Sequence, residues 1–138
     1  MMREGRRLAI LLITTTLVFM PVLGARFIDF DDAAHLRDNP YLNELSASNL
    51  AQLWLNGYIG LYVPLTYTVW ALLKHVSASE WPDVASALPT LHAWPFHALN
   101  LGLHLVSVTL VFLLLRRWSG HRRAAFWGAL VFAWHPLQ

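Results

Sequence analysis

Two long apolar stretches limit what this chain can fold into more than any other feature of its sequence. Residues 94–118 would form one α-helix of about 36 Å. Residues 8–25 reach the shortest length that crosses about 30 Å of hydrocarbon. The chain is 57% hydrophobic and only 13% charged, whereas soluble domains carry about 25% charged residues. The sequence therefore predicts an all-α membrane protein, and its seven tryptophans suit the headgroup region.

Residues 8–25 have a second interpretation, as a secretory signal peptide. Three arginines precede the stretch, and small residues end it at Gly24 and Ala25, as they do at a cleavage site. The stretch is long for the core of a signal peptide, which favours a first membrane span with a tolerated kink at Pro21. Under both interpretations, the residues after Ala25 are expected outside the cytoplasm.

The distribution of charge predicts the topology. Residues 124–138 form a third apolar segment, so the open question is whether residues 58–76 also cross the membrane. Seven of the ten Lys and Arg residues lie in two clusters, at residues 3–7 and 116–123, and seven of the eight acids lie between them. If residues 58–76 crossed, the second cluster would lie outside, against the positive-inside rule. We therefore expect three spans, a cytoplasmic N-terminus and one long outer loop over residues 26–93.

A short amphipathic helix is expected in the outer loop, lying in the plane of the headgroups. It follows Ser46, whose hydroxyl suits a helix N-cap, and it ends near Gly57. Its apolar face, which a helix at a membrane surface needs, contains Leu50, Leu53 and Trp54.

The rest of the outer loop contains a second surface helix and two irregular regions. Residues 58–76 are expected to form an interfacial or re-entrant helix, with Pro64 in its first turn. Asn39 and Pro40 mark a turn before the first surface helix, and residues 77–90 are expected to form an irregular loop.

Composition also excludes some chemistry. The chain has no cysteine, so disulfides, thiolate nucleophiles and thiolate metal sites are ruled out. The net charge is +2, but the basic residues lie beside apolar segments. Membrane topology explains them better than nucleic-acid binding does.

The acids behind the first apolar stretch are the best functional clue. Asp29, Asp31 and Asp32 lie within four residues, where a membrane helix would emerge. Carboxylates are costly inside a bilayer, so these three locate the water boundary. The run predicts a charged site facing the membrane surface, with Asp29 as a solvated neighbour. The alternative is a solvated acidic turn that only helps to keep the loop outside.

A polar stripe runs along the second apolar stretch. Its members fall within about 80° of one another on a helix, and they are His97, Asn100, His104 and Ser107. Polar side chains in a span face the protein interior or a water-filled cavity. The stripe predicts either a binding surface or interhelical hydrogen bonds worth about 0.6 kcal/mol per pair. Zinc is disfavoured, because histidines at i and i+7 have no third ligand nearby.

Five short motifs occur in one order over nearly the whole chain. They are Phe30-Asp31-Asp32, Asn39-Pro40-Tyr41, Pro64-Leu65-Thr66, the set His97, Asn100 and His104, and His135-Pro136-Leu137-Gln138. In this order they resemble the N-terminal region of GT-C membrane glycosyltransferases. The nearest resemblance is to bacterial relatives of the transmembrane O-mannosyltransferases with tetratricopeptide repeats.

The resemblance implies a reaction and a set of partners. Enzymes of this type move a hexose, such as mannose, from a polyprenyl-phosphate donor to an acceptor hydroxyl on the outer face of the cytoplasmic (inner) membrane. Their catalytic carboxylate lies in the first outer loop, which implies Asp31 as general base and Asp32 in support. The two aspartates would also be the ligands of a divalent cation, Mg²⁺ or Mn²⁺, if the reaction uses one. The acceptor would be a protein or a glycan, and membrane lipids would surround the chain.

Four further residues are candidates for binding the donor or the acceptor: His97, Asn100, His135 and Arg37. Two of them have plainer interpretations. His135 before Pro136 is also typical of a helix end, and Arg37, like Arg26, is also suited to binding lipid headgroups.

Family members continue well past the His-Pro-Leu motif, with more spans and often with tetratricopeptide repeats. The chain therefore resembles the first quarter or less of such an enzyme, and three spans are expected to be inactive because they cannot enclose a donor cavity. The alternative function is a small, non-catalytic, three-span membrane anchor or assembly subunit. A proton-coupled transporter piece would use the histidine stripe as a relay, but the outer-loop acids do not support it.

Overall fold

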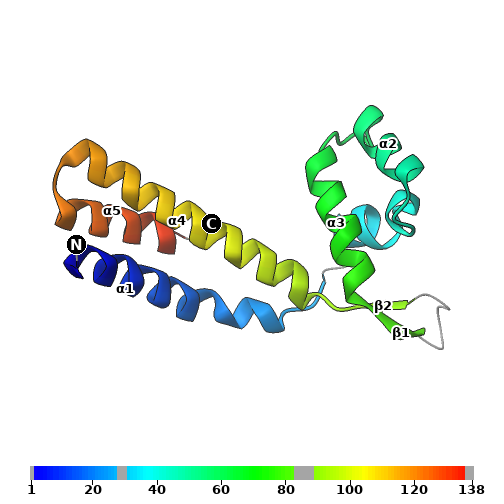
Figure 1. Ribbon diagram of the computed structural model, residues 1–138. Coiled ribbons are helices and arrows are strands. Elements are labelled where there is room, and N and C mark those ends of the chain that lie inside the picture. Colours follow the sequence, from blue (N-terminus) through cyan, green and yellow to red (C-terminus); the bar gives the residue numbers. More distant parts are fainter. Residues whose placement is uncertain (1, 28–30, 83–88, 136–138) are drawn as a thin grey trace. The chain divides into compact units, whose positions relative to one another are not determined.

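The computed structural model of the chain describes residues 2–27, 31–82 and 89–135 (Figure 1). It contains two compact units. Unit 1 comprises Met1–Leu23 and His97–Gln138, and unit 2 comprises Gly24–Phe96. Each unit is described by itself.

Unit 1 is built from three helices, α1 (Met2–Phe19), α4 (Trp94–Ser119) and α5 (Arg122–Trp134). Its core consists of fully or nearly fully buried side chains from all three helices: Leu11, Val108, Phe112, Ala125, Ala129 and Ala133. The three alanines recur every four residues, so they share one face of α5. Their small side chains let neighbouring helices approach closely, which is the usual way in which helices pack in membranes.

Two helices have the length and composition of membrane spans. They are Gly5–Gly24, with 20 residues, and Trp94–Ser119, with 26. These helices match the first two predicted spans. Helix α5 has 13 residues, which is about 20 Å and shorter than the hydrocarbon core of a bilayer. The third span at residues 124–138 therefore stays a prediction, and residues 136–138 lie outside the described part of the chain.

The threonine hydroxyls of helix α1 form hydrogen bonds within the helix. Three consecutive threonine hydroxyls donate to carbonyl oxygens one turn earlier, with Thr15 to Leu11 at 2.8 Å fully buried. The α-helix ends at Phe19 and continues as the 3₁₀ turn η1 (Met20–Gly24). Pro21 lies in this turn and has no N–H to donate to the carbonyl one α-turn earlier. The change of helix type thus occurs at the proline where a kink was predicted.

Unit 2 consists of short elements around a second core. In chain order they are the π-turn η2 (Ala33–Arg37), the 3₁₀ turn η3 (Pro40–Leu42), α2 (Ala47–Leu55), α3 (Pro64–Ser77) and the strands β1 (Ala78–Pro82) and β2 (Pro89–Leu91). The buried cluster contains Leu36, Leu42, Leu53, Tyr67, Ala71 and Phe96. Both predicted surface helices bury one face in this core, since Leu53 belongs to α2 and Tyr67 and Ala71 belong to α3.

The predicted helix starts are confirmed. The Ser46 hydroxyl accepts a hydrogen bond from the Asn49 N–H at 3.2 Å and caps α2. Pro64 is the first residue of α3. At Asn39-Pro40 the Asn39 side chain accepts from the Tyr41 N–H at 3.0 Å and opens η3, so the predicted turn is present.

Two predictions about the outer loop were wrong in detail. Residues 58–63 are not helical: Tyr58 pairs with Leu61, and Ile59 and Gly60 have φ angles of 47° and 75°. This tight turn approaches Gly57 so closely that a Cβ there would lie 3.2 Å from the Leu61 oxygen. Residues 77–90 are not wholly irregular either, because β1 and β2 pair antiparallel with Ala78 opposite Leu91. The pairing gives backbone N–H and C=O groups hydrogen-bond partners within the protein, whereas in an irregular loop these groups would bind water.

The packing of α5 makes a prediction about stability. Ala129 is fully buried, so Ala129→Leu overfills the core and should destabilise unit 1 by about 1–3 kcal/mol. Val131 lies on the same helix and is 69% exposed, which makes Val131→Leu the matched control. Thermal unfolding of both variants in detergent micelles measures the difference. Equal melting temperatures would contradict the packing described for α5.

Candidate active site

Asp31 and Asp32 begin a hydrogen-bonded turn, the acidic turn, over residues 31–38. Asp31 and Asp32 lie in helical backbone that continues directly into the π-turn η2, and the Asp38 N–H closes this turn by donating to the Ala33 oxygen at 2.9 Å. The Asp31 side chain is exposed and that of Asp32 is half-buried. Asp29 lies outside the described residues. The backbone thus presents Asp31 to solvent from a defined position.

The buried ammonium of Lys74 holds the end of this turn in place. Lys74 is the only lysine of the chain, lies on α3 and is 9% exposed. Its Nζ donates to the Leu36 oxygen at 2.7 Å, to the Arg37 oxygen at 3.1 Å and to Asn43 Oδ1 at 2.8 Å. An ammonium has three donors, and all three are used. Lys74 therefore binds the last carbonyls of η2, where helical backbone lacks its own partners.

The buried surroundings of Lys74 disfavour the charged form of its side chain. Burial lowers the pKa of Lys74 from its ordinary value of 10.5, and the nearby negative charge of Asp38 partly offsets this effect. The pKa of Asp38 is itself lowered, chiefly by its hydrogen bond from Arg37. The ammonium is thus stabilised mainly by neutral oxygens, with a further contribution from the negative charge of Asp38.

A histidine–tyrosine pair makes a second connection between η2 and α3. His35 Nδ1 and the Tyr67 hydroxyl are 2.8 Å apart, and burial raises the pKa of Tyr67. Tyr67 is 1% exposed and makes edge-to-face ring contacts with Tyr58 and Trp70. The turn that follows the aspartates is therefore held at two consecutive positions, His35 and Leu36.

Arg37 interacts with its neighbour in the sequence. Its Nε donates to Asp38 Oδ1 at 3.0 Å, and both side chains are more than half exposed. In the structure Asp31, Asp32 and Arg37 thus lie in one continuous stretch. The ion pair nevertheless joins Arg37 to Asp38, which was not among the predicted site residues.

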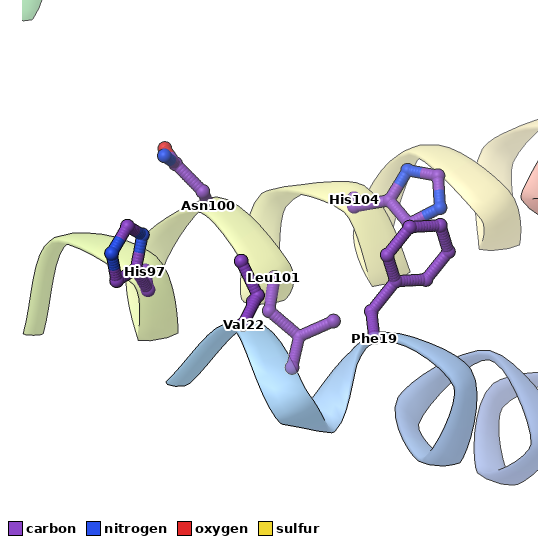
Figure 2. A pocket seen from close by; sticks show the side chains of 6 residues that line it. All are labelled: Phe19, Val22, His97, Asn100, Leu101 and His104. Atoms are coloured by element: carbon purple, nitrogen blue, oxygen red, sulfur yellow. The ribbon is translucent and has the colours of Figure 1, made fainter. Parts of the chain in front are cut away.

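A cavity in unit 1 contains part of the predicted stripe (Figure 2). It has a volume of about 180 Å³ and is lined by His97, Asn100, Leu101 and His104 from α4, together with Phe19 and Val22. The His97 side chain is half-buried, whereas that of Asn100 is exposed. His97, Asn100 and His104 therefore line one cavity, and the binding role predicted for His97 and Asn100 stays a prediction. Phe19 and Val22 were not expected there.

The side chains of His104 and Ser107 form hydrogen bonds with backbone carbonyl oxygens. His104 Nε2 lies 3.1 Å from the Ala133 oxygen of α5, and its ring meets Phe19 edge-on at 5.2 Å. This contact is the interhelical hydrogen bond that was one of the two expectations for the stripe. For Ser107 that expectation was wrong, because its hydroxyl donates to the Leu103 oxygen of its own helix at 3.0 Å. Bonding to the preceding turn is common for serine in apolar helices.

His135 is the C-cap of α5. Its backbone N–H donates to the Phe132 oxygen at 3.4 Å, its backbone is extended and its side chain is exposed. This position agrees with the helix-end interpretation. The remaining motif residues, from Pro136 onward, lie outside the described part of the chain.

The side chains that organise the acidic turn were missed in the sequence, although a signal was present. Tyr67, Ala71 and Lys74 are spaced i, i+4 and i+7, so they share one helix face, and that face is buried. A lone lysine on an apolar helix face needs acceptors. The sequence gives no indication that the acceptors of Lys74 include the carbonyl oxygens of residues 36 and 37.

Comparison with protein-family models, with curated proteins and with solved structures finds no match to this chain. Among the residues that the structure describes, no three His, Asp or Glu side chains are grouped so that they could hold a metal ion.

Substituting Lys74 should loosen the acidic turn. Lys74→Met keeps the aliphatic stem but leaves three oxygens without their donor, so unit 2 should lose about 1–3 kcal/mol of stability. The amides of residues 33–38 should exchange with solvent faster, as measured by hydrogen–deuterium exchange. His75→Met is the control, because His75 is the next residue and is exposed. Unchanged exchange in Lys74→Met would show that the ammonium does not hold the turn.

The single lysine also permits a direct titration. In protein labelled with [ε-¹³C]lysine, the Lys74 resonance should titrate below 10.5, because burial disfavours the charged form. Between its lowered pKa and 10.5 the folded state binds fewer protons than the unfolded state, so this group adds stability as pH rises. Tyr67, whose pKa is raised, has the opposite effect above 10.0. A midpoint at or above 10.5 would contradict the buried position of the ammonium.

Proposed function

We propose that the chain is the N-terminal part of a GT-C-type glycosyltransferase that transfers a hexose from a polyprenyl phosphate. The observation that carries this proposal is the exposed Asp31 carboxylate in a turn connected to α3 by Lys74 and His35. The turn follows a helix that has the length and composition of a membrane span. The order of the five motifs supports the same reaction class.

In the proposed reaction, Asp31 acts as general base. Its carboxylate accepts the proton of the acceptor hydroxyl as that oxygen attacks the anomeric carbon, and the polyprenyl phosphate leaves with the bonding electrons. A base must be held within hydrogen-bond reach of the proton that it removes. The two connections from α3 supply such positioning from the protein side. Asp32 would support the site. If the reaction uses a Mg²⁺ or Mn²⁺ ion, Asp31 and Asp32 are the residues that would hold it, and its charge would offset that of the donor phosphate.

Each unit contains candidate substrate contacts of its own. His97 and Asn100 line the cavity of unit 1 and would bind the sugar phosphate or the acceptor. His135 and Arg37 would make secondary contacts. His135 caps a helix and Arg37 already pairs with Asp38, so we assign them smaller effects than His97 and Asn100.

The proposed setting is the cytoplasmic membrane, with the N-terminus in the cytoplasm and residues 26–93 outside. Unit 2 supports this setting, because α2, α3 and the turn between them leave many large apolar side chains exposed. They are Trp54, Leu55, Ile59, Leu61, Tyr62, Leu65, Leu72 and Val76. Exposed apolar side chains around short helices suit insertion at the headgroup boundary.

Replacing the proposed base tests the function. Asp31→Asn should lower hexosyl transfer by about 10²–10⁴-fold, which is the usual contribution of a positioned general base. The assay measures transfer from a polyprenyl-phosphate hexose in membranes that contain the complete gene product. Asp32→Asn should have a smaller effect.

The matched control is Glu44→Gln, because Glu44 is an exposed acid of the same unit outside the proposed site. Membrane insertion should be unchanged in all three variants. Transfer by Asp31→Asn at the wild-type rate would remove Asp31 as base. The absence of transfer even in the unaltered protein would favour the non-catalytic anchor.

A further inference from the structure

A second cavity lies in unit 1, at the end where α1 and α5 begin. It has a volume of about 550 Å³ and shares no residue with the cavity that contains His97. Three arginines and three apolar residues line it: Arg6, Arg7 and Ile10 from α1, and Arg123, Phe126 and Trp127 from α5. The proposed transfer reaction does not use it.

The charge of this cavity is strongly positive. Among the residues from Gly5 onward whose side chains the structure describes, no carboxylate forms an ion pair with Arg6, Arg7 or Arg123. Helices α1 and α5 both start at this end (Figure 1). Arg123 lies in the first turn of α5, so the partial positive charge of that helix N-terminus adds to the three guanidinium groups. An anion with several oxygens matches this arrangement, because guanidinium groups bind phosphate through paired hydrogen bonds.

The apolar part of the lining restricts the anion further. Trp127 is 62% exposed and Ile10 is 42% exposed, while Phe126 is half-buried. Indole rings favour the headgroup level of a bilayer. A free phosphate ion would leave these apolar walls in water. A phospholipid would place its phosphate on the arginines and its glycerol and first acyl carbons on the walls.

We propose that this cavity binds the headgroup of an anionic phospholipid from the leaflet on the same side as the N-terminus. Basic pockets between membrane helices bind anionic headgroups in this way. The inference rests on the proposed membrane setting but not on the transfer reaction. The two proposals can therefore fail separately.

Lipid retention by the purified full chain tests the proposal. Native mass spectrometry from detergent micelles should show phosphatidylglycerol bound in preference to phosphatidylcholine with the same acyl chains. The triple variant Arg6→Gln, Arg7→Gln and Arg123→Gln should lower the affinity for phosphatidylglycerol by about tenfold or more, since each arginine near a membrane surface contributes appreciably. Inorganic phosphate at millimolar concentration should not displace the lipid.

The matched control removes the same charge from residues that do not line the cavity: Arg116→Gln, Arg117→Gln and Arg122→Gln. This variant should bind phosphatidylglycerol within about threefold of the unaltered chain. Equal losses in the two triple variants would overturn the site in favour of a general basic surface. Displacement of the lipid by inorganic phosphate would show that the site takes the free ion.

A second variant keeps the test decisive if the triple variant does not fold. Trp127→Ala removes part of the apolar wall and keeps all three arginines. Because most of the Trp127 side chain is exposed, the helix should fold as before, as circular dichroism can check. Affinity for phosphatidylglycerol should fall several-fold. Unchanged affinity would contradict the role of the apolar wall and, with it, the choice of a lipid over free phosphate.

Discussion

The structure of unit 2 depends on one buried ammonium group. Lys74 is removed from water at a cost, and the cost is offset only where three oxygens meet its three donors. Those oxygens belong to Leu36, Arg37 and Asn43, which lie more than 30 positions earlier in the chain. Satisfying the lysine therefore requires that α3 and the acidic turn pack together. The same contact positions the carboxylates of the candidate active site.

Unit 1 follows a different constraint, because its charged groups are confined to the ends of apolar helices. Phe19 and Val22 line the cavity that contains His97, near the C-terminal end of the first helical segment, while Arg6 and Arg7 line the basic cavity near its start. Between them the core contains Leu11, small alanines of α5 and aromatic or aliphatic residues of α4. Two chemically distinct sites can therefore exist on one bundle without charged side chains in its middle.

Much of the fold could be predicted because it depends on local patterns. Apolar length predicted α1 and α4, a capping serine predicted the start of α2, and Pro64 predicted the start of α3. The errors lie where backbone hydrogen bonding outside helices decides the structure. The Tyr58–Leu61 turn and the β1–β2 ribbon depend on backbone partners, and hydrophobic periodicity carries no information about these partners.

The sequence by itself determined where the apolar helices are, which end of each is basic, and which acids follow the first of them. These properties depend on transfer free energies that are nearly independent of distant residues. Only the tertiary structure decided what the polar side chains do. It brought Lys74 to the carbonyls of η2, used His104 for a helix contact, left Ser107 bonded to its own helix, and placed Arg123 beside Arg6 and Arg7. The reason is that a hydrogen bond or an ion site needs atoms within about 3 Å of each other, and no local pattern specifies that proximity.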